Sequence, residues 1–114
     1  MSEVTIYHNP RCSKSRQTLA LLEERGIEPR VVLYLEQPPS GDELRTLLTQ
    51  LGMSARDLAR TKESAYAELG LWNASDDDLI KAMTNHPILI ERPIVQANDK
   101  AALGRPPEDV IAIL

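Results

Sequence analysis

The sequence predicts an α/β fold in which a β-α-β half and a β-β-α half are separated by a helical insertion. Two strand patterns near the N-terminus lie roughly 20 residues apart, which leaves room for a right-handed helical crossover between parallel strands. The middle of the chain carries several helix signals, and two further strand patterns and a closing helix follow. This order predicts a mixed sheet flanked by helices.

The β-α-β half is predicted from three adjoining patterns. Residues 4–7 form a β-branched and aromatic run that ends at Asn9-Pro10, which indicates a buried strand followed by a turn. Residues 13–25 favour a helix that stops at Gly26, and residues 30–34 form the second strand.

The insertion is predicted to be helical throughout. Residues 40–43 have capping-box spacing, and leucines follow at helical intervals as far as Gly52. Shorter helices are predicted at residues 55–59, at residues 65–69 and, behind the cap Ser75, at residues 76–84.

The β-β-α half begins with strand patterns at residues 94–97 and 100–103. They flank Asn98-Asp99 and suggest a β-hairpin, although the turn lacks the glycine that gives the strongest signal. A closing helix is predicted at residues 107–113, where proline is tolerated in the first turn.

Composition limits the class of protein. A chain of 114 residues with 42% apolar content fits one globular domain, residues 1–114, without metals or disulfides. Its formal charge of −4 argues against a nucleic-acid partner. The lack of a long apolar run and of a secretory signal predicts a cytoplasmic protein with no membrane contact.

The chain has one cysteine, Cys12, and two histidines. This set falls short of a structural zinc site, so no metal is expected. A single cysteine also excludes an internal disulfide. Any reaction of Cys12 that ends in a disulfide therefore needs a thiol from another molecule.

Cys12 lies where the first strand gives way to the first helix. Such a corner leaves backbone N–H groups pointing outward, and these bind anions. Arg11, Lys14, Arg16 and His8 add positive potential nearby. We therefore predict a Cys12 thiolate that acts as a nucleophile.

Each neighbouring residue also has a plainer interpretation. Cys12 could be a small buried hydrophobe, but its polar and charged neighbours disfavour burial. Ser13 and Ser15 could simply cap the helix, which is compatible with an anion site. Ser15 occupies the place of the second cysteine in a dithiol oxidoreductase, so the site is monothiol. His8 either tunes the thiolate or is only the last residue of its strand.

Three arginines stand at structurally suggestive places. Arg92 precedes Pro93 at the entrance to a strand, Arg105 follows the hairpin, and Arg60 is predicted to close a short helix. Each alone is most often a surface charge. Together they could bind a tetrahedral oxyanion through bidentate contacts that lysine cannot match.

Several separated motifs resemble those of the glutaredoxin-dependent arsenate reductase family, and the resemblance covers nearly the whole chain. The motifs are Ile6-Tyr7-His8-Asn9-Pro10-Arg11-Cys12-Ser13-Lys14-Ser15-Arg16, Tyr34-Leu35-Glu36 with Pro38-Pro39, Glu68-Leu69-Gly70-Leu71, His86-Pro87-Ile88-Leu89-Ile90-Glu91-Arg92-Pro93-Ile94-Val95 and Gly104-Arg105-Pro106.

The resemblance implies a thioredoxin-like fold of the glutaredoxin type with a helical insertion. It implies that Cys12 is the catalytic cysteine, that His8 favours its thiolate, and that Pro93 is a cis-proline facing the nucleophile. The oxyanion-binding residues are implied to be Arg60, Arg92 and Arg105, with the helix start at Ser13, Lys14 and Ser15.

The implied reaction is the reduction of arsenate to arsenite. Cys12 attacks the arsenic, glutathione reduces the adduct, and glutaredoxin clears the resulting mixed disulfide. Glutathione is thus a reducing co-substrate, and no bound cofactor, metal or flavin is required. A monomer that detoxifies arsenic is expected.

Two alternatives share the fold. The chain could be a monothiol, glutathione-dependent oxidoreductase with another disulfide substrate. It could also be a regulator that binds RNA polymerase, because related folds include such a branch. That branch carries a redox dithiol, which Ser15 excludes here, so we rank it last.

Overall fold

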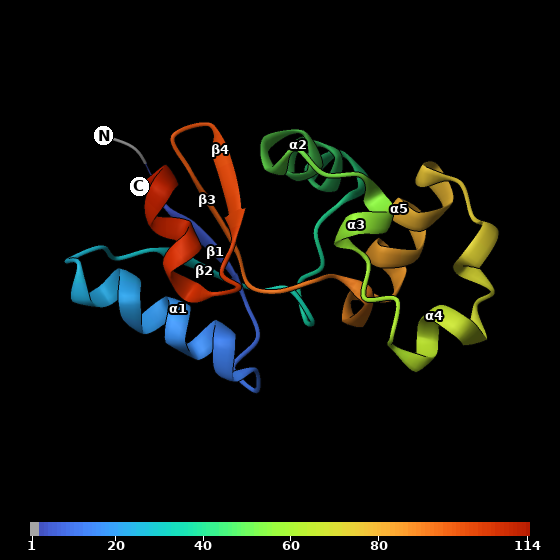
Figure 1. Ribbon diagram of the computed structural model, residues 1–114, viewed down its shortest axis with the longest axis horizontal. Coiled ribbons are helices and arrows are strands. Elements are labelled where there is room, and N and C mark those ends of the chain that lie inside the picture. The colour runs from blue at the N-terminus through green and yellow to red at the C-terminus, as the bar shows by residue number, and fades with distance from the viewer. Residues whose placement is uncertain (1–2) are drawn as a thin grey trace. The chain divides into compact units, whose positions relative to one another are not determined.

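A computed structural model describes residues 3–114 (Figure 1). The chain divides into two compact units. The first unit contains the described residues up to Gln37 together with Arg92–Leu114, and the second unit is Pro38–Glu91. The second unit is the predicted helical insertion, which is confirmed. The prediction that all 114 residues form a single domain stays a prediction.

The first unit is built on a four-stranded mixed sheet with the order β2-β1-β3-β4. Strand β1 runs parallel to β2 and antiparallel to β3, which in turn pairs with β4 in antiparallel fashion. The mixed sheet of the prediction is therefore confirmed. The strands are β1 (Thr5–His8), β2 (Arg30–Leu33), β3 (Ile94–Ala97) and β4 (Lys100–Leu103).

Two helices pack against this sheet (Figure 1). Helix α1 (Ser13–Glu24) forms the crossover from β1 to β2, and the 3₁₀ helix η3 (Pro107–Ile113) ends the chain. Their contact with the sheet is a fully buried apolar cluster. Ile6 and Val95 are register partners on β1 and β3, and they meet Leu22 of α1 and Val110 of η3. Burial of this cluster stabilises the packing of α1 and η3 on the sheet.

The β3–β4 hairpin forms without a glycine. Asn98 and Asp99 have φ values of 54° and 62°, so both adopt the left-handed conformation that a type I′ turn requires. Asn and Asp tolerate this conformation better than other residues with a side chain. The predicted hairpin is confirmed.

Some predicted boundaries shift by a residue or two. Strand β1 includes His8, and β2 ends at Leu33, after which Leu33 O accepts hydrogen bonds from the backbone N–H groups of Glu36 and Gln37. The closing helix is 3₁₀, as the bond from Asp109 N–H to Pro106 O illustrates.

The second unit is helical. Its principal helices are α2 (Gly41–Leu51) and α5 (Asp76–Asn85), which bury apolar faces. Ser40 and Glu43 form the predicted capping box, Gly52 ends α2 at φ +68°, and Ser75 caps α5. The shorter helices are α3 (Ala55–Leu58), α4 (Ser64–Glu68), η1 (Leu71–Asn73) and η2 (Pro87–Leu89).

A second capping box was not predicted. The Ser54 hydroxyl accepts from the Asp57 N–H, and the Asp57 carboxylate accepts from the Ser54 N–H. Aspartate in place of the usual glutamate concealed this signal in the sequence.

Within residues 3–114, no helix is both long and apolar enough to cross a bilayer.

Gly104 marks a close approach between α1 and the end of the hairpin. A Cβ atom at this position would overlap the Thr18 side chain and lie 2.8 Å from Pro93 Cγ. The Gly104 N–H also donates to Pro93 O at 3.0 Å, which fixes the backbone. No side chain fits here without movement of the surrounding atoms.

We predict that Gly104→Ala lowers the free energy of unfolding by about 1–3 kcal/mol through overpacking. Denaturant unfolding measures the change. Gly41→Ala is the matched control, because its Cβ would lie 3.4 Å from the mobile end of Arg45 in a helix. The free energy of unfolding of Gly41→Ala should stay unchanged or rise by at most about 1 kcal/mol. An equal decrease in the free energy of unfolding of both variants would contradict the packing explanation.

Candidate active site

Cys12 is the N-cap residue of α1. Strand β1 ends at His8, and the Asn9 side chain accepts from the Arg11 N–H at 3.0 Å. The Cys12 N–H then donates to Asn9 O at 3.0 Å, and Cys12 O accepts from the Arg16 N–H. The backbone of Cys12 is extended, with φ −94° and ψ 124°. Its side chain therefore leaves the chain at the start of the helix, where the N–H groups have no partners within the helix.

The surroundings of Cys12 favour its ionised form. Burial alone raises the pKa of the thiol, but four contributions oppose it and lower the pKa overall. They are the backbone N–H of Ser15, the charge of Arg92, the backbone N–H of Lys14 and a hydrogen bond from the Arg92 side chain. The half-buried thiol is thus held by a helix start and one guanidinium.

Arg92 interacts with Cys12 although the two residues belong to different segments of the first unit. The peptide bond between Arg92 and Pro93 is cis and leads directly into β3. Arg105 lies beside them, because its guanidinium donates to Arg92 O at 3.2 Å. The structure therefore brings Arg92 and Arg105 together and places Arg92 beside the Cys12 thiol. Pro93 has the cis conformation that the resemblance implies, and its role opposite Cys12 stays a prediction.

His8 is 6% exposed, and its Nδ1 lies 2.6 Å from Ser15 Oγ. The Asn9 N–H donates to the same hydroxyl oxygen at 2.9 Å. Burial, followed by the charge of Arg16, lowers the pKa of His8, so the ring is neutral near pH 7. The hydrogen bond between Nδ1 and the Ser15 hydroxyl fixes the orientation of this neutral ring, and the tautomer of the ring sets which of the two groups donates.

This contact changes the interpretation of Ser15. Its side chain is fully buried and bonded to His8 and Asn9, so its hydroxyl is engaged in the turn, and its backbone N–H acts on Cys12. Ser15 thus connects His8 indirectly to Cys12. That His8 favours the thiolate, and that Ser13, Lys14 and Ser15 bind an anion, stay predictions.

Arg60 belongs to the second unit. The prediction that it closes a helix is wrong, because α3 ends at Leu58 and Ala59 pairs with Ile90 in an isolated bridge. Its guanidinium pairs with the Glu63 carboxylate at 3.0 Å and donates to Ile88 O at 3.2 Å. Its contribution to an oxyanion site stays a prediction.

Asn9 is a functional residue that sequence reasoning missed. Its side chain and its carbonyl shape the turn that presents Cys12. The signal was available, because Asn before Pro after a strand is typical of a turn in which the Asn side chain bonds the backbone two residues on. The contact of Ser15 with His8 had no such local signal.

Within residues 3–114, no group of three or more His, Cys, Asp or Glu side chains could hold a metal ion. The expectation that no metal is needed stays a prediction.

A parallel β1-α1-β2 unit with a cysteine at the start of α1, followed by a cis-proline before an antiparallel hairpin, defines a thioredoxin-like thiol domain. Residues 7–113 match the profile of the ArsC family. The chain belongs to the ArsC family.

Relatives and solved structures agree with this assignment. The chain is 59% identical to "Uncharacterized protein YfgD" of Escherichia coli (strain K12), over 98% of this chain and 97% of the relative. It is 54% identical to "Arsenate reductase" of Neisseria meningitidis, over the full length of both. The solved structure of "Arsenate reductase from Vibrio cholerae" is 56% identical, with a TM-score of 0.95 over 98% of each chain. The thioredoxin-like fold is confirmed.

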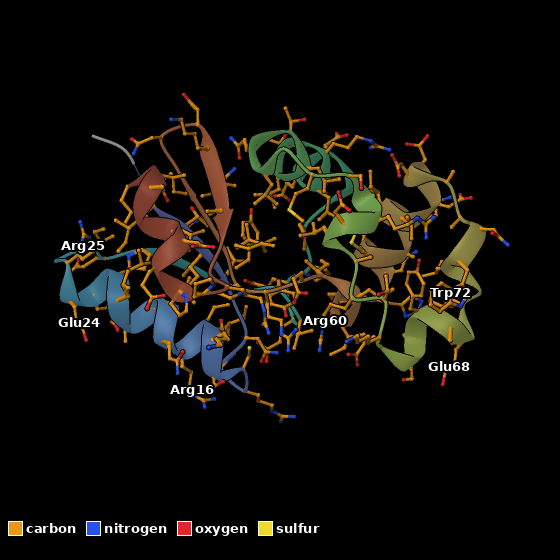
Figure 2. All side chains as sticks on the ribbon, in the orientation of Figure 1. Arg16, Glu24, Arg25, Arg60, Glu68 and Trp72 are labelled. Atoms are coloured by element: carbon orange, nitrogen blue, oxygen red, sulfur yellow. The ribbon has the colours of Figure 1, made fainter. Side chains whose placement is uncertain are left out.

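The first site prediction concerns the thiolate. Arg92→Gln should raise the pKa of Cys12, because the variant removes both a neighbouring charge and a hydrogen bond to the sulfur. Ultraviolet absorbance of the thiolate against pH measures the shift, and the pH dependence of alkylation provides a second readout. Arg25→Gln, at the far end of α1 (Figure 2), is the control and should leave the titration in place. An unchanged titration in Arg92→Gln would remove Arg92 from the site.

The second site prediction concerns His8 and stability. The folded protein binds fewer protons than the unfolded chain between the lowered pKa of His8 and the ordinary value of about 6.5. The free energy of unfolding should therefore rise with pH across this interval and fall as the pH drops through it. Denaturant unfolding at a series of pH values should show a shallower slope in His8→Asn.

The exposed His86 supplies the control. His86→Asn should keep the slope of the parent protein, and loss of the slope in this variant instead would place the pH dependence elsewhere.

Proposed function

We propose that this chain is an arsenate reductase that uses glutathione and glutaredoxin as its source of electrons. The observation that carries the proposal is the thiol of Cys12, stabilised as a thiolate by the start of α1 and by Arg92. The same two groups are suited to an oxyanion, because backbone N–H groups and a guanidinium bind negatively charged oxygens. Relatives with more than half of their residues identical to this chain are named "Arsenate reductase".

The first step is nucleophilic substitution at arsenic. Cys12 Sγ forms a bond to arsenic, an As–O bond breaks, and the departing oxygen takes up protons and leaves as water. Arg92 and the N–H groups of α1 stabilise the charge on the remaining oxygens. We propose that Arg105 and Arg60 contribute further guanidinium contacts.

The second step transfers electrons. The glutathione thiolate attacks Cys12 Sγ, and the electron pair of the S–As bond remains on arsenic, which leaves as arsenite. Two thiols are oxidised to one disulfide while arsenic gains two electrons. Glutaredoxin then exchanges its thiolate into the Cys12–glutathione disulfide and releases the Cys12 thiolate. This step needs an external thiol because the chain has no other cysteine.

We place this reaction in the cytoplasm, because turnover depends on a reducing glutathione pool. We also propose that the chain acts as a monomer without a bound cofactor.

The purified protein should produce arsenite from arsenate only when both glutathione and glutaredoxin are present, as measured by arsenic speciation. Cys12→Ser should abolish production, and Arg92→Lys should lower kcat/KM for arsenate by about 10–100-fold, since lysine lacks the bidentate geometry. Arg25→Lys is the control. A folded, reduced protein that makes no arsenite, or a Cys12→Ser variant that still does, would refute the proposal.

A monothiol oxidoreductase is the second candidate. It is favoured by one observation, that Ser15 stands where a dithiol enzyme has its second cysteine while Cys12 keeps a lowered pKa. Reduction of a glutathione mixed disulfide that survives alanine at Arg60, Arg92 and Arg105 would support this rival. The polymerase-binding alternative is tested by partner binding with a Cys12→Ala variant.

A further inference from the structure

A hollow with a volume of about 300 Å³ lies within the first unit, beside the turn at residues 9–12 that leads from β1 to Cys12. Strands β1 and β2 are parallel and their last residues, His8 and Leu33, are register partners, so both strands end at the same edge. Ligands of α/β sheets commonly bind at the carboxyl ends of parallel strands. The lining residues are His8, Asn9, Pro10, Arg11, Leu33, Leu35 and Glu36.

The hollow is joined to the nucleophile through the backbone. Asn9 and Arg11 line it, and the Cys12 N–H donates to Asn9 O. Arg11 is also the residue that directly precedes Cys12. A molecule bound here therefore lies against the same turn that presents the thiolate.

The lining combines apolar surface with opposite charges. Leu33 and Leu35 provide the apolar part, and Leu35 is 38% exposed, so its side chain is accessible to a ligand. Arg11 and Glu36 carry the charges. Among the ion pairs of residues 3–114, neither side chain has a partner. The Arg11 guanidinium and the Glu36 carboxylate do not form an ion pair with each other. They are therefore complementary to a ligand that carries both a negative and a positive charge.

His8 adds a polar ring atom to the lining. Its Nδ1 is occupied by Ser15, so Nε2 is the ring nitrogen left to hydrogen-bond a ligand in the hollow. The ring is 6% exposed and fixed by that contact, so this nitrogen is preorganised.

We propose that this hollow binds the γ-glutamyl end of glutathione, with the α-ammonium on Glu36 and the α-carboxylate on Arg11. The identity of the ligand rests on the proposed function. An α-amino acid end carries both charges on one carbon, which suits two oppositely charged side chains around a single small hollow. The volume is at the lower end of the range for small-molecule sites and suits one end of a tripeptide. The hollow borders the turn that carries Cys12, so the rest of the tripeptide has this turn within its reach.

Binding is tested with S-methylglutathione, which cannot react with Cys12. Isothermal titration of the reduced protein should show binding, and Glu36→Gln and Arg11→Gln should each raise Kd about tenfold by removing a charged partner. S-methylcysteinylglycine, which lacks the γ-glutamyl end, should bind at least tenfold more weakly than S-methylglutathione.

Glu28→Gln is the matched control, because Glu28 is an exposed carboxylate that precedes β2, whereas Glu36 follows it. Its Kd should equal that of the parent protein. Absence of S-methylglutathione binding, or equal Kd values in the Glu28 and Glu36 variants, would overturn the proposal. A fall in glutaredoxin-dependent turnover with unchanged S-methylglutathione binding would also overturn it, and would assign the surface to the protein partner.

The titration needs no arsenate, so it decides the proposal even if the chain makes no arsenite. If arsenite is produced, Glu36→Gln should raise KM for glutathione about tenfold and leave KM for arsenate unchanged. A rise in both constants would indicate a damaged active site instead and would overturn the assignment.

Discussion

The hydrogen bond from the Cys12 N–H to the Asn9 carbonyl is the constraint on which the site depends. It closes the turn after β1 and keeps Cys12 extended, so that the helix begins one residue later. If Cys12 lay one turn further into α1, its sulfur would face N–H groups already bonded within the helix. The same sequence of residues would then present an ordinary thiol. The lowered pKa of Cys12 thus comes from its position at the helix start as well as from the charge of Arg92.

The order of the strands in the sheet brings Arg92, which is distant in sequence, to the Cys12 site. Strands β1 and β3 are neighbours, and the residues before β3 therefore return to the end of the sheet at which β1 stops. Arg92 occupies that place and lowers the pKa of the Cys12 thiol. The apolar cluster of Ile6, Val95 and Leu22 holds both elements against α1. Core packing and electrostatics are coupled here, because a shift of the strands would move the guanidinium away from the sulfur.

The sequence predicted most of the elements because their signals are local. The capping box of Ser40 and Glu43, the leucine spacing of α2 and the turn after β1 each involve residues within a few positions of one another. The position of Cys12 followed from the same kind of pattern. The end of α3 was misplaced, because it is decided by the pairing of Ala59 with Ile90, far along the chain. The contact of Arg92 with Cys12 depends on strand order, and the bond between Ser15 and His8 depends on how β1 enters α1. Neither of these two contacts produces a repeating pattern of residues that could be recognised in the sequence.

Ser15 also has an evolutionary consequence. A cysteine at this position would give the chain a neighbouring thiol pair, and a single nucleotide change can produce it from some serine codons. The hydroxyl, however, both accepts from the Asn9 N–H and contacts His8 Nδ1 inside the protein. Sulfur is larger and a weaker hydrogen-bonding partner, so the substitution would disturb the turn that makes Cys12 reactive. The packing of this turn therefore disfavours a cysteine at position 15, and Cys12 keeps no neighbouring thiol with which it could form a disulfide.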